Sequence, residues 1–429
     1  MERLVVGVTK RPISVEQVKV AIRLEAENRN LLSKFVTFES GMGRFFGVIK
    51  GIEAPGIVPE FQVDGQSTVK TRKIATVENL SFRPQDGQPQ TVSTPPEENQ
   101  RVMLANTEDF EEFLPSHGTP NRGFAGLLQE SSYPLPLDMD WLCFANSMVL
   151  AGINHGKSYL ATMLAFQLFL EKKTVIVIDP TGAWKTSVGM VFEEYRKGLE
   201  AREKEVKSPT FMTRTYANLV GDRDISNNDD ALTAFSRSVV GSAKESGFYV
   251  LDLLETANLI GAKQLTLRRQ IAARIEELLF REARSLYSAS GKEYCYQTCL
   301  VVDEAHEFVG SNLEGDSSEG SCLAFFALAT QEARKYGLGH IFVDQSFRRL
   351  SDQLEVQSFF LGRFTSPGNQ EKLNSTFGPD LFKAVQRTMP GRPSSWVVYG
   401  IAAPRPYSTF PFEVRGLSNE ELVNLIIKK

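Results

Sequence analysis

The sequence has few cysteines, no long hydrophobic run and no excess of charge of either sign. Four cysteines among 429 residues are too few for a disulfide scaffold. No stretch approaches the roughly 18 uninterrupted apolar residues that a membrane-spanning helix needs. Lys and Arg number 48 against 52 Asp and Glu, a net charge of −4, which excludes a general polycation that coats nucleic acid. A local basic channel is still compatible with this balance.

The N-terminus and the cysteines give no sign of secretion or of a zinc site. The first ten residues contain too few apolar positions for the core of a signal peptide, so we expect a soluble, cytoplasmic protein. Cys295 and Cys299 have no second pair and no histidine at finger spacing, which favours buried, reduced thiols. Hydrophobic residues make up 42% and charged residues 23%, typical of a globular chain with a large core.

Residues 1–130 predict a β-rich domain. Short runs rich in Gly and β-branched residues alternate with turn signals, and residues 106–113 fit a short helix. The charged segment 15–32 is compatible with a helix. Residues 83–100 are polar, contain four prolines and predict a flexible loop. The strands expected from this pattern are 5–8, 35–38, 45–52, 73–77 and 123–128.

Residues 131–429 predict an α/β domain with a parallel sheet. From Ser147 onward, short apolar strands alternate with long helices, which is typical of such a sheet. The expected strands are 148–150, 175–178, 249–254, 300–302, 340–343, 359–364 and 396–399. The expected helices are 158–170, 191–206, 265–286 and 324–336, with a short one near the C-terminus.

A phosphate-binding loop is the strongest motif in the sequence. Residues 151–158 read Ala-Gly-Ile-Asn-His-Gly-Lys-Ser between an expected strand and an expected helix, a context that disfavours a chance match at a helix start. In such a loop, backbone N–H groups and the helix N-terminus surround phosphate oxygens. We expect Lys157 to reach the terminal phosphates and Ser158 to bind Mg²⁺. The predicted nucleotide-binding residues are Gly152, Asn154, His155, Gly156, Lys157 and Ser158.

Two adjacent acids follow the expected strand at 300–302. Asp303 is expected to bind the Mg²⁺ water shell together with Ser158, and Glu304 to act as the general base that activates water against the γ-phosphate. Side chains of neighbouring residues at a strand end diverge, so the two acids can have separate roles. The alternative is an acidic helix N-terminus stabilised by the helix dipole. The upstream loop favours the catalytic interpretation, with ATP and Mg²⁺ as cofactors.

Three further residues are candidates for catalysis. Gln345 follows the expected strand 340–343, and ligands of an open parallel sheet bind at that edge, so Gln345 is expected to sense the γ-phosphate or the attacking water. Arg334 and Arg363 are candidates for stabilising transition-state charge, in cis or from a neighbouring subunit. The alternatives are a turn residue at a strand end and two surface arginines.

This set of motifs resembles the HerA/FtsK superfamily of hexameric motor ATPases, and HerA most closely. The matching segments are 151–158, 177–182, 249–253, 301–306 and 333–345. The resemblance spans about residues 120–410 and implies a RecA-like P-loop ATPase core. The sequence Gly-Met-Gly-Arg-Phe-Phe-Gly-Val-Ile from Gly41 onward is similar to the small barrel that precedes the core in HerA. It implies an N-terminal β-barrel of the HAS-barrel type.

The resemblance implies a homohexameric ring with ATP sites between subunits, double-stranded DNA in a central pore, and a partner nuclease or defence effector. The leading hypothesis is therefore an ATP-driven DNA translocase. The alternative is a nucleotide-controlled ring scaffold that assembles an effector enzyme without processive movement. Two features motivate this alternative. The sequence has Gly182-Ala183-Trp184 where such proteins usually carry Gly-Glu-Tyr, and Ala151 replaces the first glycine of the loop.

Overall fold

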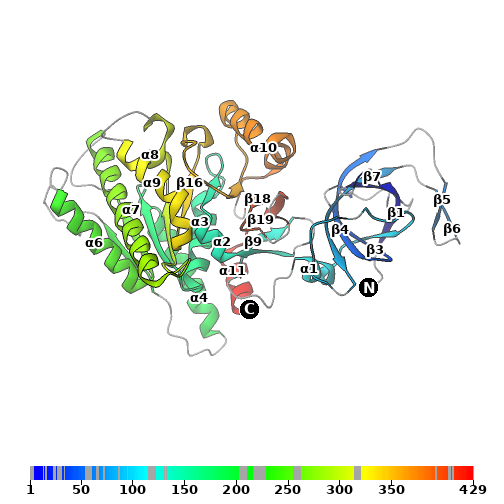
Figure 1. The fold of residues 1–429 in the computed structure, drawn as a ribbon, viewed down its shortest axis with the longest axis horizontal. Coiled ribbons are helices and arrows are strands. Elements are labelled where there is room, and N and C mark those ends of the chain that lie inside the picture. Colours follow the sequence, from blue (N-terminus) through cyan, green and yellow to red (C-terminus); the bar gives the residue numbers. More distant parts are fainter. Residues whose placement is uncertain are drawn as a thin grey trace. The chain divides into compact units, whose positions relative to one another are not determined.

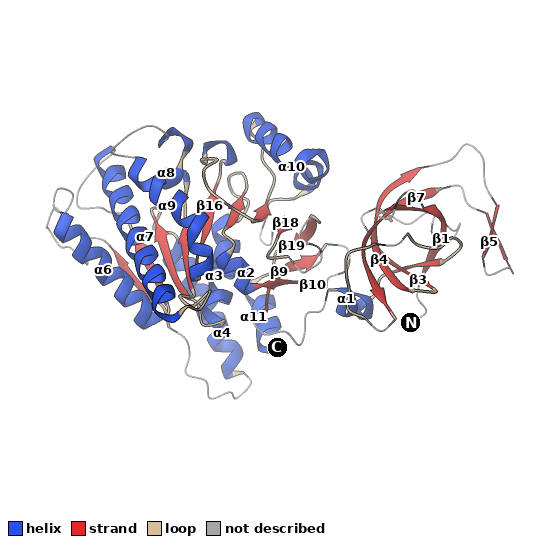
Figure 2. Ribbon diagram, in the orientation of Figure 1, coloured by secondary structure: helices blue, strands red, loops and turns tan. Residues whose placement is uncertain are grey.

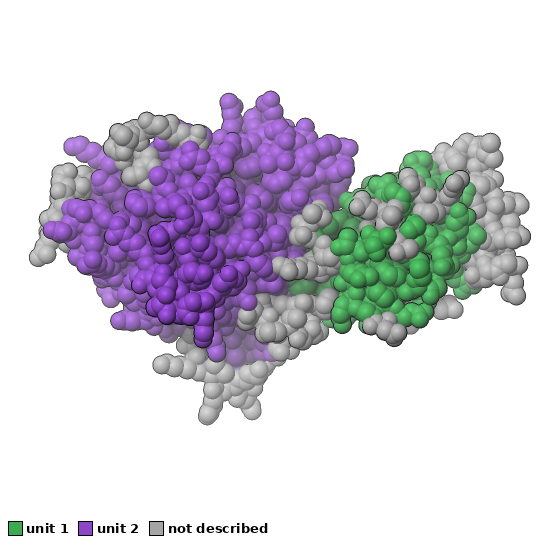
Figure 3. All heavy atoms as spheres, in the orientation of Figure 1, with its two compact units in different colours: residues 1–119, 128–136, 404–410 green, residues 120–127, 137–403, 411–429 purple. Residues whose placement is uncertain are grey.

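Two compact units make up the chain (Figure 3). Unit 1 contains residues 1–119, 128–136 and 404–410, and unit 2 contains residues 120–127, 137–403 and 411–429. The chain changes unit several times, whereas the sequence suggested one boundary after residue 130. The computed structural model describes residues 4–12, 14, 17–22, 26, 31–32, 34–53, 60–63, 67–70, 73–85, 87–93, 95–114, 122–129, 131, 133–201, 210–215, 229–254, 262–313, 320–391, 394–403, 407 and 410–428.

Unit 1 is built around a closed six-stranded barrel (Figure 1). Its strands are β1 (Val5–Pro12), β2 (Gln17–Ile22), β3 (Phe35–Ser40), β4 (Gly43–Glu53), β7 (Ile74–Pro84) and β8 (Arg101–Leu104), in the order β1-β2-β7-β4-β3-β8. β8 closes the barrel by pairing antiparallel with both β1 and β3. A separate hairpin pairs β5 (Glu60–Val63) with β6 (Ser67–Lys70). The predicted N-terminal barrel is confirmed.

The segment 15–32 contains a strand where the sequence suggested a helix. Val18, Val20 and Ile22 of β2 belong to the barrel core and are fully buried. β-branched residues at every second position fit a strand that buries one face, whereas the charged residues elsewhere in the segment, such as Glu16, Arg23 and Glu25, were the misleading signal. The remaining residues of the segment lie largely outside the described part of the chain.

The short helix α1 (Thr107–Phe113) and part of the segment 83–100 pack on the barrel. Asn106 caps α1, and Phe113 of α1 stacks on Phe46 of β4. Phe82 and Gln90 exchange two backbone hydrogen bonds, and Val92 is buried in the barrel core. The stretch expected to be a flexible loop is therefore anchored at these positions.

Unit 2 is built on an eleven-stranded sheet in the order β10-β9-β19-β18-β17-β11-β16-β15-β12-β14-β13. Figure 2 shows strands of this sheet in red among the blue helices. The strands that position the site are β11 (Ser147–Leu150), β12 (Thr174–Asp179), β13 (Met212–Thr215), β14 (Phe248–Asp252), β15 (Thr298–Val302), β16 (Leu338–Asp344) and β17 (Ser358–Leu361). They are parallel to one another. β18 (Ser395–Gly400) and β19 (Phe412–Arg415) pair antiparallel, and β9 (Arg122–Leu128) and β10 (Pro134–Asp138) complete the sheet. The predicted α/β class is confirmed.

Helices cover both faces of this sheet (Figure 1). On one face, α6 (Asp229–Ser246), α7 (Ala262–Ser290) and α9 (Gly320–Glu332) share a buried cluster with Ile176 and Ile178 of β12. Elsewhere, Phe166 of α3 (Lys157–Leu170) packs on Phe192 of α4 (Trp184–Glu200), and Phe192 in turn contacts Phe248 of β14. Because strand side chains alternate between faces, the apolar strands are buried on both sides.

Several helices differ from the expectation. α4 begins at Trp184, before the predicted start at Val191, and the predicted continuation over 202–206 lies outside the described residues. The sequence did not predict α2 (Met139–Phe144), α6 or α10 (Pro367–Arg387), whereas α11 (Asn419–Lys428) is the expected C-terminal helix. None of the described helices is long and apolar enough to cross a membrane.

Candidate functional site

The loops after β11, β15, β16 and β17 meet at the carboxyl edge of the parallel strands. These strands are neighbours in the sheet, so their carboxyl ends lie side by side. Backbone hydrogen bonds join the loops: Gly152 N–H donates to Arg363 O at 3.0 Å, and Ala305 N–H donates to Val343 O at 3.0 Å. Open parallel sheets bind ligands at this edge. The phosphate loop, the two acids, Gln345 and Arg363 therefore lie at the same edge of the sheet.

The phosphate loop has the backbone shape that its motif requires. Gly156 precedes α3 in the left-handed region with φ of 86°, and Asn154 is also left-handed with φ of 59°. Left-handed residues of this kind turn backbone N–H groups to one side and form an anion-binding concavity. Ile153, at the tip, is 75% exposed, so the loop is open to a ligand.

The His155 side chain points into the protein rather than toward a ligand. Its Nε2 lies 2.8 Å from Ser395 O, and its ring meets Trp396 edge-on with centroids 4.8 Å apart. A Cβ at Gly362 would lie 2.3 Å from the ring, so this glycine allows the close approach. Burial lowers the pKa of His155, which keeps the ring neutral at pH 7. A role in nucleotide binding is left to its backbone.

Lys157 is a buried cation with no ion pair among the described residues. Its exposed fraction is 8%, and its Nζ donates to Gly152 O at 3.0 Å. Burial lowers the pKa of Lys157, and Glu304, Asp303 and Asp344 oppose this shift from a distance. A buried ammonium without a paired anion is unfavourable. An anion is therefore the ligand that this position favours.

Asp303 is a buried carboxylate held by two N–H donors. It is 4% exposed. Its Oδ1 accepts the backbone N–H of Glu304 at 3.0 Å, and its Oδ2 accepts the indole Nε1–H of Trp184 at 2.9 Å. Burial raises the pKa of Asp303 to about 7, although the Trp184 hydrogen bond acts to lower it. A cation bound beside Asp303 would favour its ionised form.

Glu304 and Gln345, predicted as base and sensor, are in direct contact. Glu304 Oε1 accepts Nε2–H of Gln345 at 2.6 Å. Glu304 Oε2 lies 3.6 Å from Nδ1 of His306, which is itself 2.9 Å from Oδ2 of Asp344. The Asp344 contact raises the pKa of His306. Glu304 has φ of 45°, which is uncommon outside glycine and marks this turn as a place where the fold holds the backbone under strain.

The two candidate arginines lie at opposite edges of the sheet. Arg363 follows β17 beside the phosphate loop and is exposed. Arg334 lies in a short helical turn (η3, Ala333–Tyr336) that precedes β16, at the amino edge. Its guanidinium donates to Gln357 Oε1 at 2.9 Å and lies 4.5 Å over the Trp141 ring. The structure therefore does not bring Arg334 to the site of its own chain.

Asp179 and Trp184 are site residues that the sequence analysis did not identify. Asp179 ends β12, and its carboxylate accepts backbone N–H groups of Thr181, Gly182 and Trp184, each at 2.9 Å. This arrangement fixes the turn that places Trp184 beside Asp303. A polar residue at the end of a buried strand was a usable signal for Asp179. The sequence marked Trp184 only as part of the departure Gly182-Ala183-Trp184, which gave no role to its indole.

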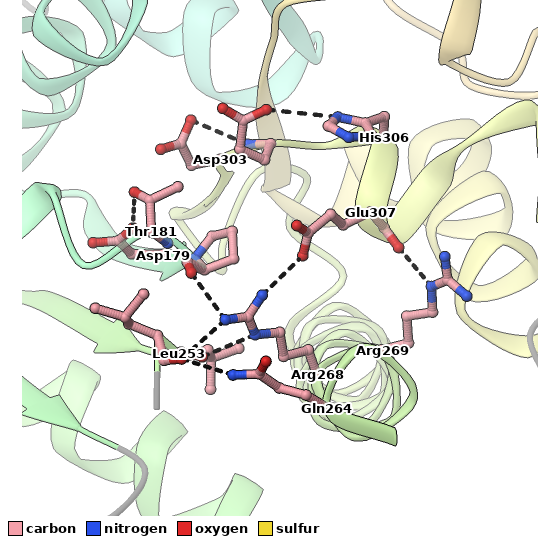
Figure 4. A network of polar contacts seen from close by, with 12 residues as sticks. Asp179, Thr181, Leu253, Gln264, Arg268, Arg269, Asp303, His306 and Glu307 are labelled. Atoms are coloured by element: carbon pink, nitrogen blue, oxygen red, sulfur yellow. Dashed lines mark hydrogen bonds and ion pairs between the residues drawn. The ribbon is translucent and has the colours of Figure 1, made fainter. Parts of the chain in front are cut away.

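Arg268 is a further residue that sequence reasoning missed. It extends from α7 toward three loops (Figure 4). It donates to Leu253 O at 2.8 Å and to Pro180 O at 3.1 Å, and its Nη1 lies 3.3 Å from Glu307 Oε2. Arg268 therefore joins the loops after β12, β14 and β15. Its position inside a regular helical pattern gave no sign of this contact.

The residues at this edge fit a nucleotide phosphate accompanied by Mg²⁺. Lys157 has no ion pair among the described residues, Asp303 is a buried carboxyl group whose pKa is raised to about 7, and Ser158 offers a hydroxyl in the first turn of α3. Oxygen donors of this kind are the ligands that Mg²⁺ prefers. The donor set thus matches the metal and the anion that the motif implies.

Known proteins give a limited comparison. No family model and no curated protein matches the sequence. Among solved structures, similarity extends to the genome packaging NTPase B204 from Sulfolobus turreted icosahedral virus 2 (TM-score 0.35, 11% identity, covering 64% of this chain and 98% of that one). VirB4 of Thermoanaerobacter pseudethanolicus is also similar, with a TM-score of 0.42 and 14% identity over 70% of this chain and 98% of that one. The bacterial conjugative coupling protein TrwB has a TM-score of 0.40 and 13% identity over 74% of this chain and 94% of that one. The function has to be inferred from the residues of this chain.

Proposed function

We propose that the chain binds ATP with Mg²⁺ at the carboxyl edge of the sheet and hydrolyses it. Lys157 carries the proposal: it is a buried ammonium at the start of α3, with no ion pair among the described residues, beside a left-handed loop. A phosphate group would supply the missing anion. The N–H groups of the loop and of the helix N-terminus would bind its oxygens.

Ser158 and Asp303 are the residues proposed to hold Mg²⁺. When bound, the ion would neutralise the charge that develops on the phosphate during hydrolysis. Asp303 needs little rearrangement, because N–H groups of Glu304 and Trp184 already orient its carboxylate. The backbone of residues 152–156 would surround the phosphates. The His155 ring would hold this loop against the backbone of β18, where it contacts Ser395.

Glu304 is the group proposed to accept a proton from the attacking water. Its side chain is 20% exposed, which leaves a path for that water. Gln345 holds one carboxylate oxygen at 2.6 Å, and the other oxygen, 3.6 Å from Nδ1 of His306, is the one proposed to act as the base. The Gln345 amide retains a second N–H and a carbonyl for contact with the water or the γ-phosphate. Arg363, exposed beside the loop, is proposed to stabilise transition-state charge in its own site or a neighbour's.

We further propose that hydrolysis drives double-stranded DNA through a homohexameric ring. The support is the order of the motifs along the sequence, which resembles the HerA/FtsK superfamily. Coupling to a partner nuclease or a defence effector is the finer form of the same proposal. The ring scaffold remains the competing function, and DNA dependence of the hydrolysis separates the two.

The test is steady-state ATP hydrolysis with and without linear duplex DNA. We expect stimulation by DNA in the wild type. We expect a loss of roughly 100- to 10,000-fold in Glu304→Gln, with ATP binding retained, because a general base is removed. Glu307→Gln is the matched control: this nearby acid pairs with Arg268 and should be dispensable for hydrolysis. Hydrolysis indifferent to DNA would contradict translocation and favour the scaffold. A wild type that neither binds nor hydrolyses ATP would contradict the whole proposal.

A further inference from the structure

Trp184 joins the end of β12 to the buried acid after β15. It is the first residue of α4 and is fully buried. Its backbone N–H donates to Asp179 Oδ2 at 2.9 Å, and its indole Nε1–H donates to Asp303 Oδ2 at 2.9 Å. The backbone hydrogen bond fixes the position of the Trp184 main chain, and the indole hydrogen bond fixes the orientation of its ring. Both hydrogen bonds are made to carboxylates.

The indole contact determines how the Asp303 carboxylate is oriented. The terminal torsion of an aspartate is broad, so a single hydrogen bond leaves the plane of the carboxylate free to turn. Here the N–H of Glu304 meets Oδ1 and the N–H of Trp184 meets Oδ2, which fixes both oxygens. A rigid indole whose backbone is itself anchored can hold such an orientation precisely. Each oxygen keeps a second lone pair for a cation or its water.

We propose that Trp184 is a positioning residue for the magnesium ligand Asp303, and that its indole N–H sets the Mg²⁺ dependence of nucleotide binding. The inference rests on the proposed function of the site. Groups that orient a metal ligand through hydrogen bonds tune metal affinity as strongly as many ligands do. Trp184 is such a group for Asp303, supplied from a turn 119 residues earlier in the chain.

The competing view is that Trp184 only fills the core. Phenylalanine would then replace it with a small loss of stability, and nucleotide affinity would change equally with and without Mg²⁺. In contrast, a positioning role predicts that the Mg²⁺-dependent part of the affinity is lost selectively. Removal of one hydrogen-bond donor, with most of the ring volume retained, separates the two views.

The experiment measures binding of a fluorescent ATP analogue with Mg²⁺ and with EDTA, for wild type and Trp184→Phe. We expect Mg²⁺ to strengthen binding in the wild type, and the Mg²⁺ concentration for half-maximal binding to rise about tenfold or more in Trp184→Phe. The affinity in EDTA should be unchanged. Tyr249→Phe is the matched control, because it removes a buried hydroxyl that has no hydrogen-bond partner among the described residues. Its Mg²⁺ dependence should match that of the wild type.

Each other outcome has a distinct meaning. Equal Mg²⁺ dependence in wild type and Trp184→Phe would overturn the inference while ATP binding stands. A wild type that binds the analogue equally well in EDTA would do the same. A wild type that does not bind it at all would refute the proposed function, and this inference with it. If Trp184→Phe does not fold, benzothienylalanine at position 184 keeps the ring shape without an N–H, and the same comparison decides.

Discussion

Two buried lysines of unit 2 show how differently the fold treats the same side chain. Lys173, 3% exposed, directly precedes β12 and lies at the amino edge of the sheet. Its Nζ lies 2.5 Å from Asp140 Oδ1 and 2.9 Å from Gln297 Oε1. Lys157, 8% exposed, lies at the carboxyl edge and bonds only to Gly152 O among the described residues. Lys173 is held by an ion pair within the fold, whereas Lys157, without such a pair among the described residues, is available to an anionic ligand.

The two candidate arginines repeat this contrast. Arg334, at the amino edge, is held by Gln357 and by the Trp141 ring. Arg363, at the carboxyl edge, is exposed, and its side chain makes no hydrogen bond or ion pair within the described part of the chain. Arg334, like Lys173, is thus held by groups of its own chain, whereas Arg363, like Lys157, has no ion pair among the described residues. This contrast supports a ligand site at the carboxyl edge.

Lys157→Met should have the largest effect. Loss of a buried cation that binds phosphate should weaken ATP binding about a thousandfold, or about 4 kcal/mol. The free energy of unfolding should not fall, because the variant buries no unpaired charge. Nucleotide titration and denaturant unfolding of the same preparation measure both quantities. If Lys157→Met retained ATP binding but lost stability, Lys157 would have the structural role that we assign to Lys173.

Arg363→Ala should lower hydrolysis about a hundredfold, while Arg334→Ala should not act on hydrolysis in its own subunit. The expected size is that of removing one group that stabilises transition-state charge. Mixing Arg363→Ala chains with Glu304→Gln chains and measuring hydrolysis shows whether the arginine serves its own site or a neighbour's. An equal loss of ATP hydrolysis in Arg363→Ala and Arg334→Ala would contradict the assignment of a catalytic role to Arg363 alone.

Lys173→Met should lower the free energy of unfolding by about 2 kcal/mol, because Asp140 and Gln297 lose their donor. ATP affinity should be that of the wild type. Thermal or urea unfolding measures the first effect, and nucleotide titration the second. Weaker ATP binding in this variant would show that the amino edge also communicates with the site.

Glu421→Gln should have the smallest effect of these variants, a small loss in the free energy of unfolding. The Arg415 guanidinium beside Glu421 holds the pKa of this carboxyl at about 2, but the side chains of the pair are 40% and 38% exposed and solvent screens them. A depressed pKa contributes stability above about pH 4.5, and the contribution is lost as the pH falls through 2. The variant should therefore be less stable by about 0.5 kcal/mol at pH 7 and equal to the wild type below pH 2. Urea unfolding across this range measures the difference.

The parts of the site that could be predicted are short motifs, each made of consecutive residues. Residues 151–158 and the acids Asp303 and Glu304 have the right residue types beside apolar strands, and parallel strands bring such ends together. Trp184 could not be predicted, because its role depends on a contact with a residue 119 positions away, and a tryptophan at a helix start otherwise indicates core packing. The same holds for Arg268, which bonds across three loops.

The fold divides in the same way. Strong apolar runs predicted most strands of the sheet and the α/β class. The barrel closes through β8, four residues long, whose pairing with β1 and β3 depends on residues far apart in the chain. β2 was hidden because the segment 15–32 is charged overall, although Val18, Val20 and Ile22 recur at every second position as in a strand.

Lys157, which has no ion pair among the described residues, is proposed to receive its anion from a nucleotide. Denaturant unfolding of wild type, Lys157→Met and Lys173→Met, with and without Mg²⁺-ATP, is the decisive measurement. At about 100 times the dissociation constant of the wild type, ATP should stabilise the wild type and Lys173→Met by about 2.7 kcal/mol each. Lys157→Met should gain almost nothing. An equal gain in all three proteins, or no gain in the wild type, would contradict the account.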